Sequence, residues 1–194
     1  IRGTEDEPMV LLKDGSQRQT RDFTNAGQPP SVYVEYLKSL QATGYKLPPQ
    51  VHVSILGIGM NGVFLGNSSG DAAARDSVRD MLDSTISSAK IIRAMMSDAT
   101  SSVFVVVPDP RFERKKDAGT QNYDPQKLSD FITQLQDRFA TDADLRAQNI
   151  YFVNPSALLP DANLRVTDDT HYTPIALAEI GNLIAAQSIV TKAC

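Results

Sequence analysis

Val51-His52-Val53-Ser54-Ile55-Leu56-Gly57 is a short, largely apolar run followed by turn-forming residues, and it decides the fold class of the chain. A run of this length and composition predicts a strand of the buried kind found in parallel sheets. Two later runs also predict strands: Val103-Phe104-Val105-Val106-Val107, which ends at Pro108, and Asn149-Ile150-Tyr151-Phe152-Val153.

Helical periodicity alternates with these runs from about residue 31 onward. Apolar residues spaced at i, i+3, i+4 and i+7 predict helix faces, and a glycine at position 44 predicts the end of the first helix. The predicted faces are Tyr33, Tyr36, Leu37 and Leu40; Val78, Leu82, Ile86 and Ala89; Leu128, Phe131, Ile132, Leu135 and Phe139; and, after Thr173-Pro174, Leu177, Ile180 and Ile184. We expect one α/β domain over residues 1–194, a flavodoxin-like three-layer α/β/α sandwich with a mainly parallel, five-stranded sheet.

Composition narrows the possible partners. The 194 residues carry 19 basic and 23 acidic side chains, a formal charge of −4, so nucleic acid or anionic membrane is not expected as a partner. No apolar run approaches the length of a membrane span. The single cysteine, Cys194, forms no internal disulfide and predicts no cysteine-based metal site.

Ligands of open parallel sheets bind beyond the carboxyl ends of the strands, and polar residues follow the strands here. Gly59-Met60-Asn61 comes directly after the first quoted run, and Asp168 and His171 stand in the loop before the last helix. Because the two residues are three positions apart, the carboxylate of Asp168 can accept the Nδ1–H of His171, which leaves Nε2 free to act as a base.

These blocks resemble the SGNH (GDSL-like) hydrolases. That family ends with D-x-x-H before a helix, has G-x-N after a central strand, and has an earlier glycine, for which Asn25-Ala26-Gly27 is the counterpart here. The resemblance implies that His171 and Asp168 activate a serine, while the Asn61 side chain and the Gly27 N–H stabilise the oxyanion. No metal or other cofactor is required.

The family's first block, G-D-S, supplies the nucleophile and is not intact in this chain. Its nearest match is Lys13-Asp14-Gly15-Ser16, which makes Ser16 the candidate nucleophile. Two alternatives stay open. Residues 9 to 24 also fit an antiparallel hairpin that turns at Asp14-Gly15, with Ser16 in the turn, so that residues 1–24 are atypical of the family. In the other alternative, the serine precedes Ile1 and the chain is a processed product.

The resemblance implies a serine esterase that hydrolyses small acyl esters, O-acetyl groups on carbohydrate above all. An acyltransferase using the same serine, and a non-catalytic binding domain that keeps the fold, are the alternatives; a regulatory or binding domain without ester chemistry is the third. His52, the other histidine, alternates with valines in its strand and is interpreted as a satisfied core or inter-layer residue.

Overall fold

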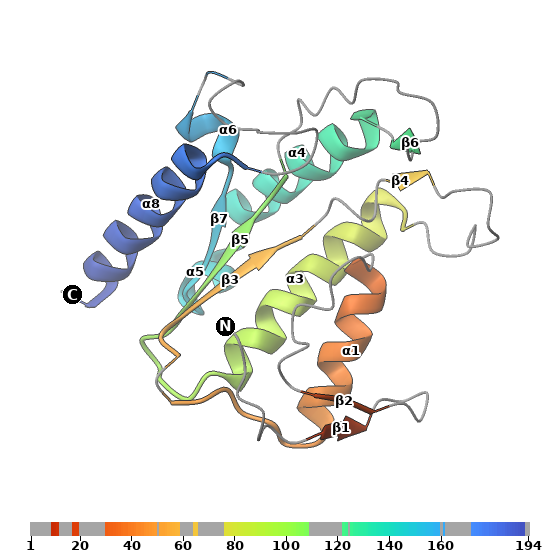
Figure 1. The fold of residues 1–194 in the computed structure, drawn as a ribbon, viewed down its shortest axis with the longest axis vertical. Coiled ribbons are helices and arrows are strands. Elements are labelled where there is room, and N and C mark those ends of the chain that lie inside the picture. Colours follow the sequence, from red (N-terminus) through yellow and green to blue (C-terminus); the bar gives the residue numbers. More distant parts are fainter. Residues whose placement is uncertain are drawn as a thin grey trace.

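The structure is a computed structural model, and it describes residues 9–11, 17–19, 30–49, 51–58, 64–65, 76–108, 122–123, 125–159, 161 and 172–192. Figure 1 shows that helices flank a small twisted sheet and that strands and helices alternate along the chain. The α/β class predicted from the sequence is therefore confirmed.

Three parallel strands form the sheet, in the order β3, β5, β7. They are β3 (Val53–Gly57), β5 (Ser102–Val106) and β7 (Ile150–Val153). The register aligns Ile55 with Phe104, and Phe104 with Tyr151, so these three side chains share one face. Every residue of β5 is buried, as expected for a strand with a neighbour on each side. The other two strands of the predicted five are not among the described residues.

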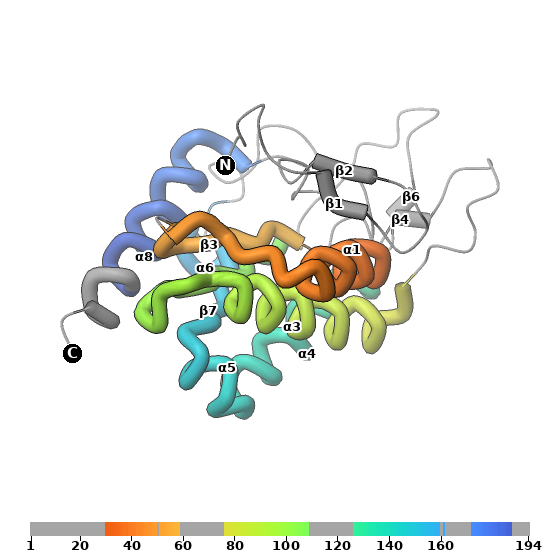
Figure 2. The backbone as a smooth tube through the Cα atoms, turned by 90° about the horizontal axis from the view of Figure 1, so that it is seen from below, coloured from red at the N-terminus to blue at the C-terminus, as the bar shows by residue number. Residues whose placement is uncertain are grey.

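Helices cover both faces of the sheet (Figures 1 and 2). On one face lie α1 (Pro30–Ala42), α3 (Val78–Met95) and α4 (Pro125–Thr141), and on the other lies α8 (Pro174–Lys192). Two short helices flank β7, namely α5 (Ala143–Ala147) before it and α6 (Pro155–Leu158) after it. Helices on the two faces account for the near-continuous apolar character of β5.

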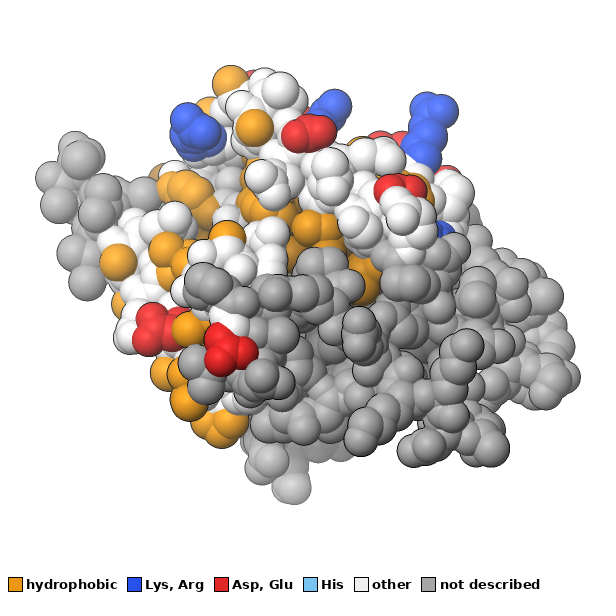
Figure 3. All heavy atoms as spheres, turned by 90° about the horizontal axis from the view of Figure 1, so that it is seen from above, with side chains coloured by type: hydrophobic (Ala, Val, Ile, Leu, Met, Phe, Trp, Pro, Cys, Tyr) orange, Lys and Arg blue, Asp and Glu red, His pale blue; other side chains and the backbone are white. Residues whose placement is uncertain are grey.

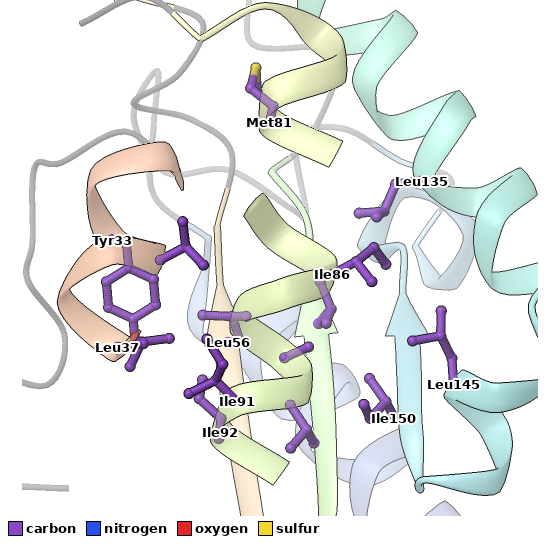
Figure 4. Close-up of a cluster of buried hydrophobic side chains, with 14 of the residues drawn as sticks. Tyr33, Leu37, Leu56, Met81, Ile86, Ile91, Ile92, Leu135, Leu145 and Ile150 are labelled. Atoms are coloured by element: carbon purple, nitrogen blue, oxygen red, sulfur yellow. The ribbon is translucent and has the colours of Figure 1, made fainter. Parts of the chain in front are cut away.

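The larger hydrophobic core lies between the sheet and helices α1, α3 and α4 (Figure 4). The predicted faces of α1 and α4 are confirmed, since Leu37, Leu128 and Leu135 are fully buried. On α3 the buried stripe is centred one position away from the predicted one. Its fully or almost fully buried members are Met81, Thr85, Ser88, Ala89, Ile92 and Met95.

A smaller core lies under α8. Phe104, Val106 and Val153 pack there against Ile180 and Ile184. Leu177, which the sequence places on the same face, is 57% exposed instead. The helix is apolar on nearly all sides, so apolar spacing alone does not show which side meets the sheet.

Strand β3 is more exposed than its composition predicts. Among the described residues it pairs only with β5, and the side chain of Ile55 is 58% exposed although its register partner Phe104 is fully buried. An apolar run predicts a strand but does not show whether the strand has one neighbour or two.

Two small antiparallel pairs complete the described strands. One joins β1 (Met9–Leu11) to β2 (Gln17–Gln19) in a register symmetric about position 14, which agrees with the hairpin interpretation of this region. The other joins β4 (Phe64–Leu65) to β6 (Asn122–Tyr123). The described part of β1 and β2 forms no ladder with the parallel sheet.

Local signals at the helix ends are confirmed where they are described. Helix α1 ends at Ala42, and Gly44 adopts a φ of 77°, the left-handed conformation that favours glycine. At the start of α8, the Thr173 hydroxyl accepts a hydrogen bond from the Ala176 N–H at 3.1 Å.

Candidate functional site

The carboxyl ends of β3, β5 and β7 lie at one edge of the sheet, at the top of Figure 1, and α1, α3 and α8 begin at the same edge. Figure 3 looks down onto this edge and shows apolar side chains gathered in the middle of the described surface, between isolated acidic and basic side chains. In parallel sheets this edge is where ligands bind.

All five predicted site residues lie outside the residues that the structure describes. They are Ser16, Gly27, Asn61, Asp168 and His171. What the structure describes is the chain next to three of them: Ile58 precedes Asn61 by three positions, Tyr172 follows His171, and Gln17 follows Ser16.

Ile58 and Tyr172 are both attached to the end of β5. The backbone N–H of Ile58 donates a hydrogen bond to the carbonyl oxygen of Val106 at 3.3 Å. The hydroxyl of Tyr172 donates to the carbonyl oxygen of Val107, the next residue, at 2.5 Å. Two segments more than 100 positions apart in the sequence are thus attached to consecutive carbonyls at the carboxyl edge.

The attachment of Tyr172 is supported by packing as well. Its ring lies against the core under α8, together with Val153 and Ile180. The next residue, Thr173, is buried and caps α8 through its hydroxyl. The packed ring and the bonded hydroxyl of Tyr172, together with the cap from Thr173, hold the start of α8 firmly at this edge.

Asp76 and Ser31 form a second connection at the edge, which sequence reasoning missed. Asp76 is 5% exposed, and its Oδ2 accepts the backbone N–H of Ser31 at 2.9 Å. Its Oδ1 accepts the Ser31 hydroxyl in a very short hydrogen bond. The two residues are 45 positions apart, so no local pattern could have indicated the contact.

The neighbourhood of Ser16 differs from that of Asn61 and His171. Strand β2, which begins at Gln17, lies with β1 beside the C-terminal half of α1 (Figure 1). That end of α1 is opposite to the carboxyl edge of the sheet. The described neighbour of Ser16 therefore lies away from the carboxyl edge, where the described neighbours of Asn61 and His171 are attached.

His52 occupies the amino end of β3, at the opposite edge of the sheet. Its Nδ1 lies 3.2 Å from Oδ2 of Asp98, and its side chain is 47% exposed, so the interpretation of His52 as a core residue is wrong. Asp98 also accepts hydrogen bonds from the N–H and the hydroxyl of Thr100. The Thr100 N–H, then its hydroxyl and then His52 lower the pKa of Asp98 below its usual value.

The described part of the chain contains no group of three His, Cys, Asp or Glu side chains placed to hold a metal ion. In that part, no helix combines the length and the apolar character needed to cross a membrane. Comparison with known proteins finds no family model, no curated protein and no solved structure that matches the chain.

Proposed function

We propose that the chain is a serine esterase of the SGNH type that hydrolyses small acyl esters, O-acetyl groups on carbohydrate above all. The observation that carries this proposal is the attachment of Ile58 and Tyr172 to the consecutive carbonyls of Val106 and Val107. The predicted chemistry requires Asn61 and His171 to converge on one small volume, and this attachment supports it, because a described neighbour of each residue is bonded at the end of β5.

Chain geometry connects this observation to the site. Consecutive Cα atoms lie about 3.8 Å apart, so His171 has its Cα within that distance of the Cα of Tyr172. Three residues span at most about 11 Å, which keeps Asn61 within reach of Ile58. Both residues can therefore contribute to a site above the end of β5.

In the proposed reaction the serine Oγ transfers its proton to Nε2 of His171 and attacks the ester carbonyl carbon. Asp168 accepts the Nδ1–H and fixes the tautomer of the imidazole. The oxyanion accepts hydrogen bonds from the Asn61 side chain and the Gly27 N–H. The C–O bond then breaks, and the imidazolium returns the proton to the departing alkoxide.

Water completes the cycle. His171 takes a proton from a water molecule, the hydroxide attacks the acyl carbon, and the serine leaves with the proton that the imidazole carries. The products are the free alcohol and the carboxylic acid. If a second alcohol replaces water as the acceptor, the same steps give an acyltransferase.

The finer fold that we propose is the flavodoxin-like sandwich with five strands. The free edge of β3 supports it, because the described residues leave one side of β3 without a partner and Ile55 largely exposed. Open apolar strand edges are normally paired or covered in stable proteins.

A serine-reactive fluorophosphonate, followed by mass spectrometry of the adduct, tests the nucleophile. Ser16 is the candidate within the chain, and labelling there supports the proposal in full. Labelling at another serine keeps the esterase and replaces Ser16. If a folded sample takes up no label, the serine mechanism is wrong.

One observation favours the second candidate function, a non-catalytic binding domain. The described strands beside Ser16 pair antiparallel and lie away from the carboxyl edge, whereas the first block of the family follows a parallel strand. Such a domain would bind an O-acetylated oligosaccharide, measurable by calorimetry, but would release no acetate from it. An esterase would release acetate at a rate proportional to protein concentration.

A further inference from the structure

The carboxylate of Asp76 caps a helix other than its own. Helix α3, which follows Asp76, is capped by Ser77 and Asp80: the Ser77 hydroxyl accepts the Asp80 N–H at 3.1 Å, and Asp80 Oδ2 accepts the Ser77 N–H at 3.1 Å. Asp76 is therefore free to accept from Ser31, in the first turn of α1.

Helix α1 needs an acceptor from outside. The first N–H groups of any helix lack partners within the helix, and the residue before Pro30 is Pro29, which has no side-chain oxygen to offer them. The first turn of α1 also contains no acidic residue. Asp76 supplies both the acceptor atoms and the negative charge that a helix N-terminus favours.

The location gives this cap a further role. Both helix starts lie at the carboxyl edge of the sheet, and Ser31 is four positions after Gly27 along the chain. A buried carboxylate held by two hydrogen bonds fixes the position of the groups it contacts, because separating them would leave it unpaired away from water.

We infer that Asp76 and Ser31 are a positioning pair, which holds the start of α1 against the start of α3 and so fixes the entry into α1 for catalysis. This inference rests on the proposed function. Neither residue takes part in bond making or breaking. Their effect is on geometry, and a displacement of about 1 Å costs on the order of 100-fold in rate.

Four variants test the pair. Asp76→Ala removes both hydrogen bonds and should lower kcat on an aryl acetate by about 10-fold to 100-fold with little change in KM. Ser31→Ala keeps the hydrogen bond from the backbone N–H of residue 31 to Asp76 and should lower kcat less. Asp76→Asn should restore most of kcat, because its amide oxygen accepts the N–H and its NH₂ donates to the Ser31 hydroxyl. Asp80→Ala, which removes the exposed cap of α3, is the matched control and should keep kcat.

Hydrogen exchange at the first amides of α1 supplies a readout that does not need turnover. Exchange there should be faster in Asp76→Ala than in Asp80→Ala. Equal exchange in the two variants would show that Asp76 does not cap α1. An unchanged kcat in Asp76→Ala would show that the pair does not position the site. An inactive wild-type protein overturns the esterase and the positioning role with it, while the exchange comparison still decides whether Asp76 caps α1.

Discussion

The hydroxyl of Tyr172 is bonded to the backbone carbonyl of Val107, so the residue after His171 is attached to the end of the central strand. The two residues are 65 positions apart in the sequence, so tertiary packing brings them together. The carboxyl edge of β5 therefore holds the residue that directly follows the last predicted block of the site.

Tyr172→Phe should lower both stability and turnover. The ring still packs against the core under α8, but the Val107 carbonyl loses its donor, at a cost of about 1 kcal/mol. Turnover of an aryl acetate should fall on the order of tenfold, because the chain next to His171 loses one attachment to the sheet. Tyr151→Phe is the control, because that hydroxyl contacts Asn149 at the amino end of β7. Equal turnover in the two variants would separate Tyr172 from the site.

His171→Ala should reduce turnover by on the order of 10⁴-fold, the cost of removing a triad base. The chain has two histidines, so His52→Ala is a matched control at the opposite edge of the sheet. Steady-state rates on one aryl acetate measure both. A tenfold loss in His171→Ala, or an equal loss in the control, would remove His171 from the mechanism.

Local signals predicted much of the fold. The face of α1 with Leu37 and Leu40, the glycine that ends this helix and the Thr173-Pro174 start of α8 are all confirmed. Each depends on residues within a few positions of one another, where periodicity and capping chemistry act directly.

Relations between distant segments could not be predicted in this way. The exposure of Ile55 depends on which strands flank β3, and the exposure of Leu177 on how α8 rotates against the sheet. The buried pair of Asp76 and Ser31 joins the starts of two helices. In each case the partner lies far along the chain, and tertiary packing determines the contact.

Acid should destabilise the protein in part through Asp98. Its pKa is lowered in the folded state, first by the Thr100 N–H. The carboxylate therefore stabilises the fold above the ordinary aspartate pKa of about 3.9, and this contribution is lost as pH falls through the lower, folded pKa. Melting temperature measured from pH 6 to pH 2 should fall less steeply in Asp98→Asn than in the wild type.

His52→Gln is the control for that experiment. It removes the imidazole but keeps both hydrogen bonds from Thr100, which are the larger causes of the lowered pKa. Its melting temperature should fall with pH about as steeply as that of the wild type. A slope as shallow as that of Asp98→Asn would mean that the ion pair, rather than the turn at Thr100, stabilises the carboxylate.

Substitution by alanine should have opposite effects on stability at Gly44 and at Gly181. Gly44 has a φ of 77°, so an added Cβ strains the backbone, and Gly44→Ala should cost about 1 kcal/mol. Gly181 lies inside α8, where an added Cβ meets no atom within 4 Å, and Gly181→Ala should stabilise by about 0.5–1 kcal/mol. Urea denaturation measures both, and equal signs would contradict the backbone assigned to one of them.

Ile55 and Phe104 are register partners on the same face of the sheet, and truncating each of them tests whether β3 is an edge strand. Phe104 is fully buried and stacks on Tyr151 with ring centroids 5.2 Å apart, so Phe104→Ala should cost about 3–5 kcal/mol. The proposed five-stranded sheet covers β3, so Ile55→Ala should cost about 2–5 kcal/mol, the value for a buried isoleucine. If Ile55→Ala changes stability by no more than about 0.5 kcal/mol, as expected for a side chain that is 58% exposed, β3 is an edge strand and the five-stranded sheet is wrong.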